Sequence, residues 1–94
     1  MVIVKFIGGF KALTRLDSLE LSDSEVNDVA AVLMKLVERF GSEFEDAIFD
    51  KELKNPRGRA LILKNGREIG VLEGLRTRVE SGDTLVIIPV VHGG

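Results

Sequence analysis

The sequence contains no cysteine and only one histidine, His92, among its 94 residues. The lack of cysteine excludes disulfides, cysteine nucleophiles, thiolate metal sites and iron–sulfur clusters. A single histidine does not make a metal site, because such sites need several converging ligands. We therefore interpret His92 as a solvated residue, and we expect neither a metal site nor a permanently bound cofactor.

The sequence also lacks a strong excess of either charge and any long apolar run. Its 13 Lys and Arg residues are scattered and the formal net charge is −2, which indicates neither a nucleic-acid nor a membrane surface. The N-terminal run Met1–Ile7 has no basic lead-in and is too short for a signal peptide or a membrane span. We expect a cytoplasmic protein with no nucleic-acid or membrane partner. The pairs Arg57/Arg59 and Arg76/Arg78 are interpreted as solvated loop residues rather than a phosphate site.

A chain of 94 residues can form one modest hydrophobic core and has no room for a second. Its 45% hydrophobic and 30% charged residues are typical of an ordinary globular domain. No internal repeat divides it. We therefore predict a single domain over residues 1–94, with a flexible C-terminal tail at about residues 90–94.

The first part of the chain has the pattern of two antiparallel strands. Residues 2–7 are rich in Val and Ile, and placing Lys5 in solvent directs Val2, Val4 and Phe6 toward the core. The pair Gly8–Gly9 predicts a turn, and residues 14–21 predict a second strand. Residues 10–13 fit either strand or loop. Val2, Val4 and Phe6 are therefore the residues of the first strand that we expect in the core.

A long amphipathic helix follows. Ser22 and Glu25 have capping-box spacing, which predicts Ser22 as the N-cap. Gly41 is expected to end this helix, and Ser42 begins a second capping pattern that predicts a short helix over residues 43–49. The apolar residues of the long helix recur every three or four positions: Val26, Val29, Ala30, Leu33, Leu36, Val37 and Phe40.

The next part predicts a loop and a hairpin. Residues 50–58 are polar and contain Pro56 and Gly58, as in a loop, and residues 60–64 read as a strand. The dipeptide Asn65–Gly66 predicts a type I′ turn, which needs positive φ at both positions. The return strand begins at residues 67–69.

Residues 70–79 are interrupted by glycine and predict an irregular crossover under the sheet with one 3₁₀ turn. A last strand is expected at residues 84–88, and its apolar character argues for a central position. The residues of the crossover that need burial are Val71, Leu72, Leu75 and Val79. The order of elements predicts an α+β fold of the ubiquitin-like β-grasp type, with a mixed sheet of about four to five strands and one main helix packed across it.

The C-terminal segment combines features that suit presentation of a carboxylate. A Gly82–Asp83 turn leads into the apolar strand, and Pro89 lacks an N–H, so we expect it to end strand pairing and release the tail. Gly93 and Gly94 have no Cβ, which lets the backbone enter a narrow channel. The sequence therefore predicts a reactive terminus held away from the domain.

The stretch Leu72–Asp83, the strand Leu85–Pro89 and the terminal Gly93–Gly94 together resemble the MoaD family of sulfur carriers, in particular its archaeal-type members. The thiamine-pathway carrier ThiS is related and shares the Gly-Gly end. The sequence departs from the family pattern in two places. Val90 stands where a second proline is usual, and His92 stands where a small residue is usual.

The resemblance implies a carrier rather than an enzyme. It implies that a ThiF/MoeB-type activating enzyme uses ATP and Mg²⁺ to adenylate the Gly94 carboxylate, with Gly93 threading the active site, and that a sulfur donor protein then converts it to a thiocarboxylate. The sulfur would go to a molybdopterin precursor in a MoaE-like large subunit, with this chain as the small subunit of molybdopterin synthase. The tail residues that these partners would contact are Pro89, Val90, Val91 and His92.

A docking surface is expected from the alternation along the strands. Ile7, Val86 and Ile88 fall on the face opposite the helix, where an uncovered aliphatic patch would bind a partner. The alternative is that residues 70–79 merely cover this face.

Three functions stay open at this point. The chain could be the molybdopterin sulfur carrier, or a modifier conjugated to lysines or a sulfur carrier for tRNA thiolation or thiamine, or a non-reactive β-grasp binding module. The sequence leaves open the sulfur acceptor, the choice between molybdenum and tungsten, and the oligomeric state.

Overall fold

The computed structural model describes residues 1–49 and 59–90. The loop expected over residues 50–58 lies outside the described residues, as do Val91, His92, Gly93 and Gly94.

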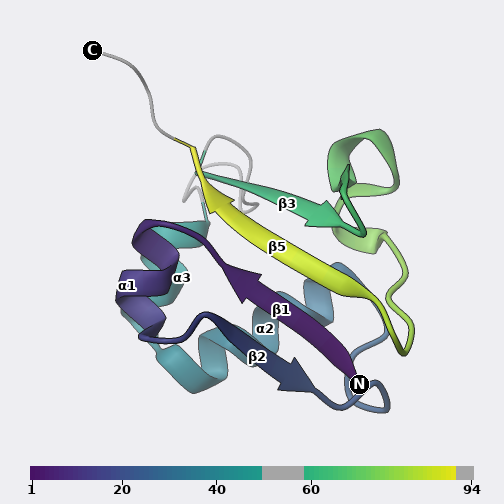
Figure 1. Cartoon of the computed structure of the whole chain (residues 1–94), viewed down its shortest axis with the longest axis horizontal. Helices are drawn as coiled ribbons and strands as arrows, with labels where there is room; N and C mark the ends of the chain where they lie inside the picture. Colours follow the sequence, from purple (N-terminus) through teal and green to yellow (C-terminus); the bar gives the residue numbers. More distant parts are fainter. Residues whose placement is uncertain (50–58, 91–94) are drawn as a thin grey trace.

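Within the described residues, five strands form one mixed sheet in the order β2-β1-β5-β3-β4 (Figure 1). The central strand β5 is parallel to β1 and antiparallel to β3. The predicted β-grasp fold and the central position of the last strand are confirmed. The strands are β1 (Val2–Phe6), β2 (Ser18–Leu21), β3 (Ala60–Lys64), β4 (Arg67–Glu68) and β5 (Thr84–Pro89).

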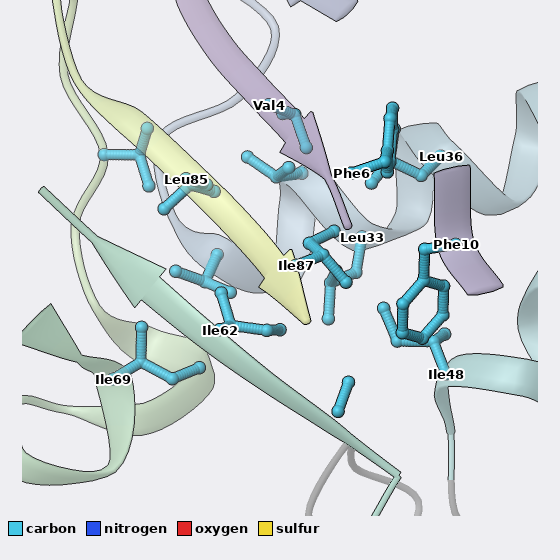
Figure 2. Packing of buried hydrophobic residues seen from close by; sticks show 14 of the residues in the cluster. Val4, Phe6, Phe10, Leu33, Leu36, Ile48, Ile62, Ile69, Leu85 and Ile87 are labelled. Carbon is cyan, nitrogen blue, oxygen red and sulfur yellow. The ribbon is translucent and has the colours of Figure 1, made fainter. Parts of the chain in front are cut away.

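In residues 1–49 and 59–90, three α-helices accompany the sheet: α1 (Gly9–Thr14), α2 (Val29–Phe40) and α3 (Ser42–Ile48). In Figure 1, α2 passes behind the sheet and so covers one face. The alternation in β1 and β5 directs every second side chain toward this layer, which explains the single core between sheet and helices (Figure 2). Fully buried members of this core are Val2, Val4, Phe6, Val29, Val32, Leu36, Phe44, Leu85 and Ile87.

The structure differs from the expectation between β1 and β2. Residues 10–13, which fit strand or loop, belong to helix α1, so β2 begins at Ser18 rather than at residue 14. Phe10 and Thr14 are one helical turn apart and both buried, and the Phe10 ring lies 5.8 Å from the ring of Phe44 in α3. Burial of this side of the short helix outweighs the β-strand pattern.

The start of the long helix was also predicted wrongly. The N-cap is Asp28, whose carboxylate accepts a 2.7 Å hydrogen bond from the backbone N–H of Ala31, and not Ser22. The residues on either side of this N-cap pair with the crossover. The Val29 N–H donates to the Thr77 carbonyl at 3.0 Å, and the Val79 N–H donates to the Asn27 carbonyl at 3.0 Å.

The end of the helix and the hairpin were predicted correctly. Gly41, with φ +82°, ends α2, and α3 occupies almost the expected range. Asn65 and Gly66 have φ of +49° and +87°, as a type I′ turn requires.

The crossover is irregular, with the 3₁₀ turns η1 (Ile69–Val71) and η2 (Gly74–Arg76). Val79 is buried as expected, but Val71 is 78% exposed, so the prediction that it needs burial was wrong. η2 contacts α2, which places this part of the crossover on the helix side of the sheet. Among the helices of the described ranges, none combines the length and apolar character that a membrane span requires.

Candidate functional site

The N-terminal end of β5 is tied to the β3–β4 hairpin by side chains. The Asp83 carboxylate accepts hydrogen bonds from the Glu80 N–H (2.7 Å) and the Asn65 amide (2.9 Å), and Lys64 Nζ lies 3.7 Å away. The Asn65 amide oxygen accepts from the Thr84 N–H at 2.9 Å. We call these five residues the hairpin clamp.

The hairpin clamp sets the ionisation of Asp83. Burial by itself disfavours the charged carboxylate, but the Glu80 N–H, the Asn65 amide and the Lys64 ammonium outweigh it and hold the Asp83 pKa below its ordinary value. The carboxylate is therefore stabilised in its charged form at neutral pH.

The opposite end of β5 is held on the β1 side only as far as Ile87. The Ile7 N–H donates to the Ile87 carbonyl at 3.1 Å. In a parallel ladder the next bond would run from the N–H of residue 89 to the Ile7 carbonyl. Pro89 has no N–H, and the Ile7 carbonyl accepts from the Phe10 N–H at 3.2 Å instead. The proline therefore leaves the Ile7 carbonyl with a hydrogen-bond donor, although the donor comes from α1 and not from β5.

On the β3 side the ladder continues past the proline. Ala60 lies opposite Pro89, and the Val90 N–H donates to the Arg59 carbonyl at 3.1 Å. The prediction that Pro89 ends strand pairing was wrong for this side, because the missing N–H of Pro89 faces β1 and not β3. The described chain is thus hydrogen-bonded to the sheet up to Val90.

The face of the sheet opposite the helices carries the expected aliphatic residues. Ile7 is 45% exposed, and Val86 and Ile88 are half-buried, whereas their neighbours Leu85 and Ile87 point into the core. The predicted orientation of Ile7, Val86 and Ile88 is therefore correct, and Ile7 is not covered by the crossover.

Two further residues of this face were missed. Leu61 lies opposite Ile88 and Leu63 opposite Val86 in the β3–β5 ladder, and Leu61 is 40% exposed. Their signal was the alternation of residues 60–64, in which Ala60 and Ile62 are buried. We name Ile7, Leu61, Leu63, Val86 and Ile88 the open-face patch.

The chemistry available in the described part of the chain is limited. Residues 1–49 and 59–90 contain no group of three or more His, Cys, Asp or Glu side chains that could hold a metal ion. Gly93, Gly94, Val91 and His92 lie outside the described residues, so their assigned roles stay predictions. What the structure shows is how the strand that leads to them is held.

A profile of the ThiS family matches residues 4–94. The chain belongs to the ThiS family. This confirms the resemblance to the ThiS/MoaD group of ubiquitin-like sulfur carriers. ThiS-family carriers are non-catalytic substrates of activating enzymes, so the chain is a carrier and not an enzyme.

Solved structures similar to this chain cover nearly its whole length. Small archaeal modifier protein 1 (SAMP1) from Methanosarcina acetivorans is 31% identical with a TM-score of 0.84, over 99% of this chain and 95% of that one. Urm1 from Trypanosoma brucei is 26% identical with a TM-score of 0.80, over 99% and 94%. The BexX/CysO complex from Amycolatopsis orientalis contains a chain that is 26% identical with a TM-score of 0.79, over 100% of both chains. A comparison with curated protein sequences finds no match.

Proposed function

We propose that this ThiS-family chain carries sulfur as a thiocarboxylate on Gly94 and donates it to molybdopterin as the small subunit of molybdopterin synthase. The observation that supports this best is the position of β5. It is the central strand of the sheet, its inward side chains are fully buried, and it leads directly through Pro89 and Val90 to the segment that ends in Gly93–Gly94. The family match also extends through Gly94.

The proposed chemistry takes place on the terminal carboxylate. An oxygen of the Gly94 carboxylate attacks the α-phosphorus of Mg²⁺-bound ATP, and pyrophosphate leaves, which gives an acyl-adenylate. A sulfur nucleophile at the oxidation level of sulfide, supplied by a donor protein, then attacks the carbonyl carbon, and AMP leaves with the bonding electrons. The product is a thiocarboxylate in which sulfur replaces one oxygen.

This chain contributes positioning to that reaction, and the partners contribute the catalysis. The open-face patch docks on the ThiF/MoeB-type activating enzyme, and the tail residues Pro89, Val90, Val91 and His92 contact the channels of that enzyme and of a MoaE-like subunit. The relative CysO was solved in a complex with BexX, which supports a protein partner for this fold. We place these events in the cytoplasm.

The test is an activation assay with purified components. The chain is incubated with ATP, Mg²⁺ and the activating enzyme of the same organism, and pyrophosphate release is measured. The control is the chain without Gly93 and Gly94, which should release none. Addition of sulfur donor, MoaE-like subunit and molybdopterin precursor should then yield molybdopterin. Activation without transfer to this precursor would refute the molybdopterin assignment and retain the carrier.

A second function is favoured by the similarity to SAMP1, which is named as a modifier protein. In that case the activated carbonyl is transferred to lysine amines of other proteins. Cells would show a ladder of conjugates that disappears when Gly93 and Gly94 are deleted. If the chain supplies sulfur for tRNA or for thiamine, the same deletion should lower the amount of thiolated tRNA or of thiamine, respectively. A non-reactive module would show no change in either product.

A further inference from the structure

We propose that Gly8 is a positioning residue for the reactive tail. It holds the Pro89 ring at the point where β5 leaves the sheet and thereby fixes the origin from which the tail reaches the activating enzyme. This proposal rests on the proposed function, because the step that it assists is activation of Gly94.

The evidence is the contact between the β1–α1 turn and the end of β5. A Cβ atom added at Gly8 would lie 3.2 Å from Cγ and 3.6 Å from Cδ of Pro89, so the proline ring occupies the space next to Gly8 that a side chain would need. On its other side, residue 89 is opposite Ala60, and the Val90 N–H is bonded to the Arg59 carbonyl. We call Gly8, Pro89, Val90 and Arg59 the tail base.

The tail base has an asymmetric construction. Toward β3, a backbone hydrogen bond holds the chain. Toward β1, Pro89 has no N–H to donate, the Ile7 carbonyl accepts from the Phe10 N–H instead, and no backbone hydrogen bond to the Pro89 carbonyl is found among the described residues. Contact between the proline ring and Gly8 is therefore what limits sideways movement of the chain on this side.

Gly8 suits this place for two reasons. Its φ of +57° and ψ of −126° belong to a turn conformation that L-residues adopt only with strain. In addition, a side chain here would push the ring, since a 3.2 Å separation is tighter than ordinary carbon–carbon contact. A larger residue would therefore shift Pro89 and weaken the Val90–Arg59 hydrogen bond.

A fixed base matters because the remaining tail is short. The four residues after Val90 span at most about 14 Å when fully extended. If the starting point or direction of such a short segment changes, the carboxylate is displaced. Reaction with ATP requires the reacting atoms to be almost in contact, so even a small displacement slows it. The expected effect is on kcat, whereas KM, set by docking of the open-face patch, should change little.

The structure offers a matched control. Gly74 has φ +59°, almost that of Gly8, yet nothing lies within 4 Å of a Cβ added there. Gly8→Ala and Gly74→Ala therefore both place a side chain at a positive φ, but only the added Cβ at Gly8 meets Pro89. Comparing these variants separates positioning of the tail from general loss of stability.

The experiment measures two properties of each full-length variant. The first is hydrogen exchange of the Val90 amide by NMR, which needs no enzyme. The second is kcat and KM for adenylation by the activating enzyme with ATP. We expect Gly8→Ala to accelerate Val90 exchange and to lower kcat by about tenfold, and Gly74→Ala to leave both near the values of the unsubstituted protein.

Equal Val90 exchange, or an equal loss of kcat, in the two variants would overturn the proposal. If Gly8→Ala does not fold, Pro89→Ala removes the same contact from the other side and should give the same faster exchange and lower kcat; an unchanged Val90 amide would refute the role of the contact. If the unsubstituted protein is not adenylated, the proposed function fails, while Val90 exchange still decides whether Gly8 holds the tail base.

Discussion

The two ends of β5 are held in different ways. At the start of the strand, the hairpin clamp uses charged and amide side chains, including Asp83 and Asn65, to tie the strand to the β3–β4 hairpin. At the other end, backbone hydrogen bonds from Ile7 to Ile87 and from Val90 to Arg59 hold the chain, and the Pro89 ring lies next to Gly8. One end is thus anchored by side-chain hydrogen bonds, and the other is held only up to the point where the tail begins.

This difference suggests a division of roles along one strand. Side-chain hydrogen bonds at the start resist sliding of β5 within the sheet, and the core beneath Leu85 and Ile87 resists separation from the helices. The far end needs to be fixed in position but must not cover the tail. Backbone hydrogen bonds and a proline ring hold this end without a network of polar side chains like the one at the start of the strand.

The largest expected effect comes from truncating one side chain of β5 that points into the core. Ile87 is completely buried, so Ile87→Ala should lower the free energy of unfolding by about 2–5 kcal/mol. Val86→Ala, one residue away on the open face, should cost clearly less. Urea denaturation of both variants measures the difference. Equal losses would mean that the two faces of β5 are not as distinct as the structure shows.

The next effect concerns the hairpin clamp. Both carboxylate oxygens of Asp83 accept hydrogen bonds, whereas the amide of Asp83→Asn has only one oxygen that can accept. The substitution should therefore cost about 1–3 kcal/mol of stability at neutral pH. The folded-state pKa of Asp83 lies below its unfolded value, so its contribution is present above the unfolded pKa and is lost as pH falls through the folded pKa. The stability gap between Asp83→Asn and the unsubstituted protein should therefore narrow in acid.

Urea denaturation at pH 7 and near pH 3 tests this prediction. The control is Asp17→Asn, because the Asp17–Lys11 ion pair is exposed and should contribute no measurable stability. A stability gap for Asp83→Asn that is the same at both pH values, or is matched by Asp17→Asn, would contradict the assigned clamp.

A smaller effect on stability, with a large effect on binding, is expected on the open face. Ile88→Asp should lower stability by about 1 kcal/mol, because Ile88 is only half-buried. It should nevertheless weaken binding to the activating enzyme, since it places a charge in the open-face patch. Calorimetric titration with the enzyme measures the affinity, and circular dichroism confirms the fold.

The matched control is Met34→Asp. Met34 is 55% exposed on α2, on the other side of the sheet, so the same charge there should leave affinity unchanged. Normal binding by Ile88→Asp, or equal weakening by both variants, would remove the open face from the docking surface.

Much of this fold could be predicted from local patterns. The alternation in residues 2–7, the Asn65–Gly66 turn and the apolar run of residues 84–88 each correspond to one element of the structure. Periodicity and turn chemistry depend on neighbouring residues, and these are visible in the sequence. The N-cap of α2 was missed because tertiary pairing of Asn27 and Val29 with the crossover overrides the capping signal of Ser22.

Only part of the open-face patch could be predicted from the sequence, because local patterns again carry only part of the information. The orientation of Val86 and Ile88 follows from alternation alone. The inclusion of Leu61 depends on the register of β3 against β5, and the role of Gly8 depends on a contact between residues 81 positions apart. Neither register nor such a contact is contained in a local pattern. The failure to foresee that Val90 stays bonded has the same origin, since it required knowing which neighbour the missing N–H of Pro89 would face.

The measurement that tests the central claim most directly is the intact mass of the protein from its own cells after incubation with ATP, Mg²⁺, the activating enzyme and sulfur donor. Peptide fragmentation locates any change. The account predicts an AMP adduct or replacement of one oxygen by sulfur, located at Gly94 and absent when Gly93 and Gly94 are deleted. An unmodified Gly94 under these conditions would contradict it and would favour a non-reactive binding module.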